Sequence, residues 1–234
     1  MPSSLHAPRG ALHTVLLDID GTLLGSNDAH ARAWVDSLAA HGYVVPFERV
    51  RPLIGMGGDK LTPELTGLDP DSAESKRISE TRSEIFLSRE LPTLKPTPGA
   101  RALLERLKSD GMELVVATSA KEAEVTALLE QAGVADLIQA ASSADDAERS
   151  KPDPDIVRAA LHIVGRLASH CVMIGDTPYD VEAATRARVP IIAVRCGGWD
   201  DTALRGAMEI RADPADVLAH YDESVLGKAV NGER

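Results

Sequence analysis

The stretch HTVLLDIDGTLLGS, His13 to Ser26, places two aspartates directly after a run of apolar residues. A short run that is apolar at every position is typical of a strand buried on both faces. Side chains alternate along an extended chain, so Asp18 and Asp20 are predicted to lie on the same side. Two carboxylates this close repel each other unless a cation, a proton or a reaction compensates. The stretch therefore predicts a buried strand that delivers a functional pair of carboxylates.

Length, composition and charge limit the possible partners. The chain has 234 residues and a formal net charge of −11, from 25 basic and 36 acidic residues, which argues against a nucleic acid or an anionic membrane as partner. No apolar run approaches the roughly 20 residues that span a membrane, and residues 1–10 lack the apolar segment of a secretory signal. Cys171 and Cys196 are interpreted as core or loop thiols. We expect a cytoplasmic protein, monomeric or homodimeric.

Apolar runs alternate with helical patterns along most of the chain, which predicts an α/β fold with a Rossmann-like, doubly wound parallel sheet. The expected strands are His13–Leu17, Glu113–Ala117, Leu137–Ala140, Cys171–Ile174 and Pro190–Val194. The expected helices between them are Gly99–Ser109, Lys121–Gln131, Pro154–Val164 and Pro178–Ala187.

Residues 27–94 interrupt this alternation with helical patterns only, at His30–Ala40, Glu48–Leu53 and Ala73–Arg89. The segment is too long to be an ordinary loop. It predicts an inserted helical cap over the carboxyl ends of the strands, where open parallel sheets bind ligands. The expected division is an α/β core of residues 11–26 and 95–225, a cap of residues 27–94, and flexible ends at 1–10 and 226–234.

Further polar residues follow other expected strands. Thr118 and Ser119 end the strand LVVA, Lys151 opens KPDPD, and Asp176 and Asp180 lie in GDTPYD. The carboxyl ends of parallel strands share one edge, so these side chains are expected to converge on the aspartate pair. Taken singly, each has a simpler interpretation as a turn residue, a solvated lysine or a helix cap.

Four motifs in this order resemble those of the haloacid dehalogenase superfamily, in its phosphoglycolate phosphatase-like and β-phosphoglucomutase-like subgroup with a helical cap. They are DIDGT at residues 18–22, the strand end at Thr118, KPDP at Lys151, and GDTPYD at residues 175–180. The insertion stands where many members carry their cap. One departure is Gly25, where many capped members have an aspartate, and it predicts altered hinge or substrate contacts.

A phosphate ester is a dianion, so its hydrolysis at this site calls for a divalent cation, and Mg²⁺ prefers oxygen ligands. Asp18 and Asp176 are the expected carboxylate ligands. The resemblance implies that the backbone carbonyl of Asp20 is a third ligand. It also implies that Asp180 steadies the site through water or Lys151.

The chemistry divides between the two aspartates of the opening stretch. Asp18 is expected to attack phosphorus and form an aspartyl phosphate. Asp20 is expected to protonate the leaving oxygen and then to activate water, which requires unequal environments that separate the two pKa values. Lys151, the Thr118 hydroxyl and the amides around Ser119 and Ala120 are predicted to hold the phosphoryl oxygens.

Other residues are weaker candidates. Gly21 is expected where a side chain would crowd the phosphate. Arg51 and Lys60, beside the glycines of IGMGGDK, are candidates for holding the non-reacting end of the substrate, with solvated basic residues as the alternative. His30 and Trp34 face the site or pack within the cap. Gly197, Gly198 and Trp199 border the leaving-group pocket or form a turn.

The resulting hypothesis is a Mg²⁺-dependent phosphatase of a small soluble phosphate monoester, of the phosphoglycolate or sugar-phosphate type. A β-phosphoglucomutase-like phosphomutase is the first alternative. Phosphonoacetaldehyde hydrolysis through Lys60 and a non-catalytic sensor of a phosphate ligand are two others. Dehalogenation is disfavoured, because the dehalogenases of the family lack the second aspartate found here as Asp20.

Overall fold

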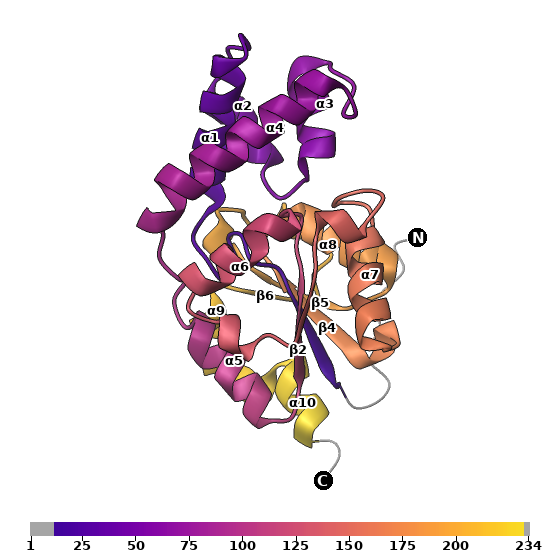
Figure 1. The fold of residues 1–234 in the computed structure, drawn as a ribbon. Helices are drawn as coiled ribbons and strands as arrows, with labels where there is room; N and C mark the ends of the chain where they lie inside the picture. Colours follow the sequence, from indigo (N-terminus) through magenta and orange to yellow (C-terminus); the bar gives the residue numbers. More distant parts are fainter. Residues whose placement is uncertain (1–11, 232–234) are drawn as a thin grey trace.

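The computed structural model describes residues 12–231 of the chain. Its centre is a six-stranded parallel sheet in the order β3-β2-β1-β4-β5-β6 (Figure 1). The strands are β1 Thr14–Leu17, β2 Glu113–Ala117, β3 Ala140–Ser142, β4 Cys171–Gly175, β5 Ile191–Val194 and β6 Glu209–Arg211. Strand β1 lies in the middle of the sheet, paired with β2 and β4, so the residues that follow it open onto the centre of one edge.

Helices cover both faces of the sheet, as the alternation predicts. They are α5 Ala100–Ser109, α6 Glu122–Gln131, α7 Asp155–Val164, α8 Pro178–Ala187, α9 Pro214–Ala219 and α10 Val225–Asn231. Successive residues of β1 point to opposite faces: Leu17 packs in the cluster with α5, α6, α9 and α10, and Leu16 in the cluster with α7 and α8. The doubly wound α/β fold is therefore confirmed.

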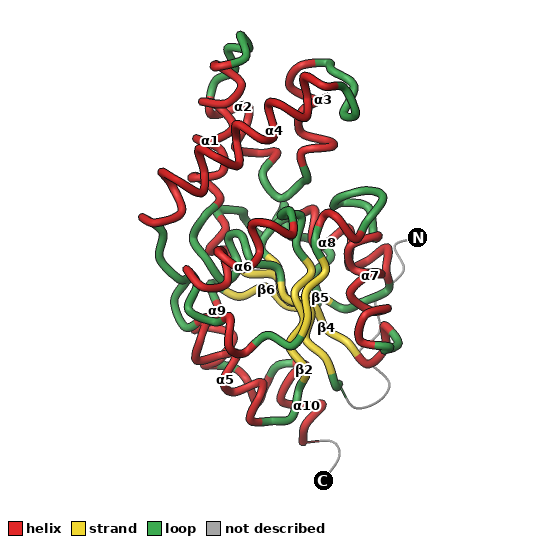
Figure 2. Tube along the Cα trace, in the orientation of Figure 1, coloured by secondary structure: helices red, strands yellow, loops and turns green. Residues whose placement is uncertain are grey.

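Residues 27–94, called here the helical insertion, stand apart from the sheet at the carboxyl ends of the strands (Figure 1). They contain α1 Asn27–Ala40, α2 Phe47–Val50, α3 Gly58–Thr66 and α4 Ala73–Ile85. A small core of their own holds them together, with Trp34, Leu38 and Ile78 among its buried residues. Loops join the insertion to the sheet unit on either side (Figure 2), and one isolated bridge between Leu24 and Pro96 ties these two connections together.

Several boundaries differ from the expectations. The predicted strand Leu137–Ala140 is wrong in position, because Ala135–Leu137 form a 3-10 turn and β3 begins at Ala140. Helix α3 and strand β6 were not predicted. The flexible end expected from residue 226 is also corrected, since α10 continues to Asn231 and Leu226 is fully buried. Residues 1–11 and 232–234 lie outside the described part of the chain, so the flexible start expected at residues 1–10 is not described.

Candidate active site

The predicted convergence of polar residues is found at the carboxyl edge of the sheet. Asp18 follows β1, Thr118 follows β2 and Asp176 follows β4, and all three side chains are buried. Parallel pairing of β1 with both neighbours brings these strand ends together. The strand topology therefore explains how residues as far apart in the chain as Asp18 and Asp176 meet at one place.

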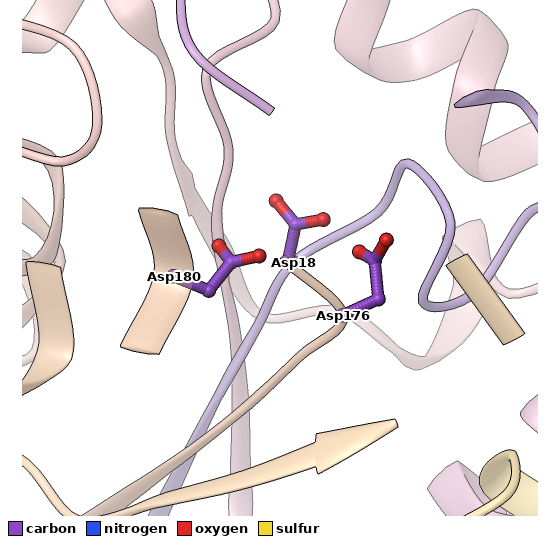
Figure 3. A group of neighbouring side chains, drawn as sticks. All are labelled: Asp18, Asp176 and Asp180. Atoms are coloured by element: carbon purple, nitrogen blue, oxygen red, sulfur yellow. The ribbon is translucent and has the colours of Figure 1, made fainter. Parts of the chain in front are cut away.

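Three carboxylates share this place: Asp18, Asp176 and Asp180 each offer an oxygen within 4.8 Å of the others. Their side chains point into a common space (Figure 3). Asp18 and Asp176 are the pair expected to bind a metal directly. Asp180 was expected to act through water or Lys151. Its carboxylate nevertheless lies as close to Asp18 and Asp176 as these two lie to each other, within the same 4.8 Å limit, because Asp180 is in the first turn of α8.

One buried ammonium group faces the carboxylates. Lys151 Nζ lies 2.5 Å from Asp18 Oδ1 and 2.7 Å from Asp180 Oδ1, and only 1% of the residue is exposed. Burial disfavours its charge, but the two aspartates outweigh burial and raise the pKa of Lys151 above its ordinary value. Three ionised carboxylates and one ammonium leave two uncompensated negative charges, which fits a divalent cation.

The remaining repulsion is visible in the pKa values of the aspartates. Burial, with added repulsion from Asp180 and Asp20, raises the pKa of Asp18 to about 7, against the lowering effect of Lys151. Burial and the charges of Asp180 and Asp18 also raise the pKa of Asp176 well above its usual range. A divalent cation held by these carboxylates would favour their ionised forms.

We expect the metal-free protein to lose stability as pH rises from about 4 to 7. In this window the folded state holds protons on Asp18 and Asp176 that the unfolded chain, with an ordinary pKa of 3.8, has released. The free energy of unfolding contributed by these groups therefore falls with rising pH. Melting curves in EDTA should show this fall, and Mg²⁺ should raise Tm more at pH 8 than at pH 5. A Tm of the metal-free wild type that rises with pH relative to the Tm of Asp18→Asn would contradict the raised pKa of Asp18.

Asp20 has a different environment from Asp18. It accepts hydrogen bonds from Ser26 Oγ at 2.5 Å and lies 2.8 Å from His30 Nε2. Burial would raise the pKa of Asp20, but His30, Ser26 and Arg82 together lower it. The expected inequality of the two aspartates is therefore present. In the metal-free protein the pKa of Asp18 is raised and that of Asp20 is lowered, which is the reverse of the order that a nucleophile at 18 and an acid at 20 require. A cation beside Asp18 would lower the pKa of Asp18.

Asp176 occupies a slot formed by two glycines and two hydrogen-bond donors. Thr22 Oγ1 donates to Oδ1 at 2.9 Å, and Asn27 Nδ2 donates to Oδ2 at 2.7 Å. A β-carbon on Gly21 or on Gly197 would overlap the Asp176 carboxylate. Gly21 was expected to make room for phosphate; the structure shows that it makes room for this carboxylate. Asn27, the first residue of α1, was missed, since an Asn at a helix start ordinarily indicates only a cap.

The strand end at Thr118 supplies hydroxyl and amide groups. The Thr118 hydroxyl accepts a hydrogen bond from the Ala120 amide at 3.0 Å, and the Ser119 hydroxyl donates to the Gly55 carbonyl at 3.3 Å. The alternative that Thr118 or Ser119 caps α6 is wrong, because the helix begins at Glu122 with Lys121 as its N-cap.

A cavity of about 50 Å³ lies between these groups and the helical insertion. Its floor is Asp18, Asp20, Thr118, Ser119 and Ala120, and the insertion lines the opposite side. The insertion residues that line it are His30, Trp34, Ile54, Gly55, Met56, Gly57, Gly58 and Arg82, and Glu124 of α6 completes the wall. His30 and Trp34 thus face the site, and Trp34 also packs in the core of the insertion. The glycine loop reaches the site from the insertion side.

The two basic residues expected near the substrate are engaged elsewhere. Lys60 pairs with Asp153, and Arg51 donates to Asp28 and to the Gly197 carbonyl. Neither lines the cavity around Asp18 and Asp20. The arginine of the insertion that does line it is Arg82 on α4. It was missed because it is one of several arginines in a polar helical pattern.

Comparison with known proteins identifies the family. The family model described as haloacid dehalogenase-like hydrolase matches residues 15–194, which include every motif residue of the site. The chain belongs to the haloacid dehalogenase-like hydrolases. The predicted family and the prediction of a phosphatase enzyme are therefore confirmed. None of the helices described within residues 12–231 is both long and apolar enough to cross a membrane.

Three proteins illustrate the likeness. A phosphoglycolate phosphatase of Caulobacter vibrioides is 33% identical over 199 residues, 83% of each chain. The SUPPRESSOR OF QUENCHING 1 protein of Arabidopsis thaliana is 36% identical over 80% of this chain, which spans only 18% of that much longer protein. A putative β-phosphoglucomutase structure from Bacteroides vulgatus has a TM-score of 0.81 at 26% identity, with 94% of this chain and 90% of that chain covered.

Proposed function

We propose that this haloacid dehalogenase-like phosphatase is Mg²⁺-dependent and hydrolyses a small phosphate monoester, of the phosphoglycolate or sugar-phosphate type, in the cytoplasm. The observation that carries the proposal is the group of Asp18, Asp176 and Asp180 around the Lys151 ammonium, with Asp18 on the floor of the cavity under the helical insertion. The helical insertion is proposed to act as the cap. The helical insertion lines the cavity opposite Asp18 and Asp20, and a site covered in this way favours a small metabolite over a phosphorylated protein.

The donor set fits Mg²⁺. Asp18 and Asp176 would supply carboxylate oxygens, and Asp20 would supply its backbone carbonyl oxygen. Asp180 would stabilise this set through water or Lys151. The ion would keep room for water and a substrate oxygen. When bound, the ion would neutralise part of the charge of the phosphoryl group and of Asp18. The buried Asp18 carboxylate could then approach the phosphoryl group without prohibitive repulsion.

The reaction uses the two aspartates in sequence. Asp18 attacks phosphorus, the bond to the leaving oxygen breaks, and Asp20 delivers a proton to that oxygen. Asp20 then takes a proton from water, which attacks the aspartyl phosphate and releases inorganic phosphate. His30, at 2.8 Å from Asp20, keeps the Asp20 carboxyl oriented between these steps. Lys151 and the Thr118 hydroxyl stabilise the negative phosphoryl oxygens.

A phosphomutase is the second candidate, and the likeness to a putative β-phosphoglucomutase structure favours it. Such an enzyme transfers the phosphoryl group from Asp18 to a sugar rather than to water. Phosphonoacetaldehyde hydrolysis through Lys60 gains no support, because Lys60 is paired with Asp153 outside the cavity.

The test is a phosphate-release screen over small phosphorylated metabolites, with Mg²⁺ and with EDTA. We expect release that EDTA abolishes and that excess Mg²⁺ restores. Activity insensitive to EDTA would refute the magnesium dependence. Conversion of a sugar phosphate into its isomer without phosphate release would establish the phosphomutase instead.

A further inference from the structure

An ion pair crosses from the helical insertion to the sheet unit inside the catalytic cavity. Arg82 Nη1 of α4 donates to Glu124 Oε2 of α6 at 3.0 Å, and the Ser83 hydroxyl donates to the other carboxylate oxygen. The Arg82 side chain is 9% exposed and that of Glu124 is 1% exposed. Both residues line the cavity that contains Asp18 and Asp20, so they face the part of a substrate that does not react.

The basic side chains that line this cavity are already paired with carboxylates. Among the described residues that line it, the basic side chains are Arg82 and His30, paired with Glu124 and Asp20 respectively. Lys151, beneath the cavity, is held by Asp18 and Asp180. A carboxylate on the leaving group would therefore find no free cation beyond the phosphate site, and it would approach the buried Glu124 carboxylate.

Hydrogen-bonding capacity remains at the same place. Arg82 Nε is buried and has no hydrogen-bond partner, which is costly unless a ligand or water accepts from it. The guanidinium lies over the Trp34 ring, 5.4 Å from the ring centre, which holds it in position. A hydroxyl group can accept from Nε and donate to Glu124, whereas a carboxylate can only accept.

We propose that Arg82 and Glu124 form a neutral recognition pair that selects a leaving group bearing hydroxyls and no charge. The preferred substrate is then a small polyol or sugar phosphate, and a phosphorylated carboxylic acid such as phosphoglycolate is a poor one. This inference rests on the proposed phosphatase function and narrows its substrate class. The Glu124 carboxylate repels a carboxylate on the leaving group, and the unpartnered Nε–H of Arg82 attracts a hydroxyl oxygen.

Two matched pairs of compounds test the selection in the wild-type enzyme. 2-Hydroxyethyl phosphate differs from phosphoglycolate, and glycerol 3-phosphate from 3-phosphoglycerate, by a hydroxymethyl group in place of a carboxylate. We expect kcat/KM to favour the hydroxyl member of each pair by about tenfold or more. Equal or higher values for the acids would overturn the inference. If neither these four compounds nor p-nitrophenyl phosphate released phosphate with Mg²⁺, the proposed function itself would fail.

Glu124→Gln removes the charge while keeping the shape, and it frees Arg82 to bind a carboxylate. We expect the preference for the hydroxyl compounds to fall by about tenfold, chiefly through a lower KM for phosphoglycolate. Glu130→Gln, an exposed glutamate on the same helix, is the control and should keep the wild-type ratio. An unchanged ratio in a folded Glu124→Gln enzyme would refute the role of Glu124. The wild-type comparison decides the substrate class even if this variant does not fold.

Discussion

Asp18→Asn is expected to lower kcat by about 10⁴-fold or more. An amide is a poor nucleophile toward phosphorus, and the variant also loses a charged oxygen from the proposed magnesium site. The same substitution should leave the metal-free protein as stable as the wild type or more stable, because Asp18 is repelled by Asp180 and Asp20 and its pKa is raised to about 7 by burial and by these charges. Loss of activity together with retained stability is the distinctive outcome.

Two measurements check this expectation: phosphate release with p-nitrophenyl phosphate, and the Tm of the metal-free protein at pH 7.5. Asp136→Asn serves as the control, since Asp136 is an exposed aspartate whose partner is Arg101. It should alter neither kcat nor the response to Mg²⁺. A kcat for Asp18→Asn above about one hundredth of the wild-type value would exclude Asp18 as the nucleophile.

Lys151→Met should weaken both folding and catalysis. The ammonium lies between Asp18 and Asp180 with 1% of the residue exposed, so its removal leaves buried carboxylates without a counter-charge. Breaking a buried ion pair in this way costs about 3–5 kcal/mol of unfolding free energy. In catalysis, one lost donor to the phosphoryl oxygens costs about 10² to 10³ in kcat.

Chemical denaturation with and without Mg²⁺ separates the two effects. Mg²⁺ should recover part of the stability of Lys151→Met, because it supplies positive charge beside the same carboxylates, and it should not recover kcat. Lys60→Met is the matched control: its ammonium pairs with Asp153 and the Lys60 side chain is 26% exposed, so we expect a loss below about 1 kcal/mol. Similar losses of unfolding free energy in the two variants would show that the buried contacts of Lys151 contribute no more to stability than the partly exposed contact of Lys60.

The sequence was sufficient for the centre of the site because strand ends are easy to locate. Apolar runs mark β1, β2 and β4, and parallel pairing then requires Asp18, Thr118 and Asp176 to meet. Strand β3 was misplaced because Leu137 and Ile138 resemble a strand better than the small residues Ala140–Ser142 that pair with β2. Strand β6 was missed because none of its three residues is fully buried, so it lacks an apolar run.

The walls of the cavity could not be predicted in the same way. Arg82 and Glu124 are 42 positions apart, and their contact depends on how the helical insertion sits over α6. No local periodicity encodes that placement. Helix α3 was hidden by the glycine at its start and by Pro63 inside it, both of which ordinarily argue against a helix. The residues at the strand ends could therefore be predicted from local sequence patterns. The residues on the cavity wall could not, because their contacts depend on the assembled fold.

The two glycines beside Asp176 have a consequence for protein engineering. Even alanine at either position would place a methyl group inside the space of the carboxylate, and Gly21 also has a φ of +83°, which disfavours any L side chain. Libraries that seek new substrates can therefore randomise the cavity wall on α4 and α6 while these two codons stay fixed. Keeping both glycines avoids variants in which a new side chain displaces the Asp176 carboxylate, a defect that would remain with any substrate.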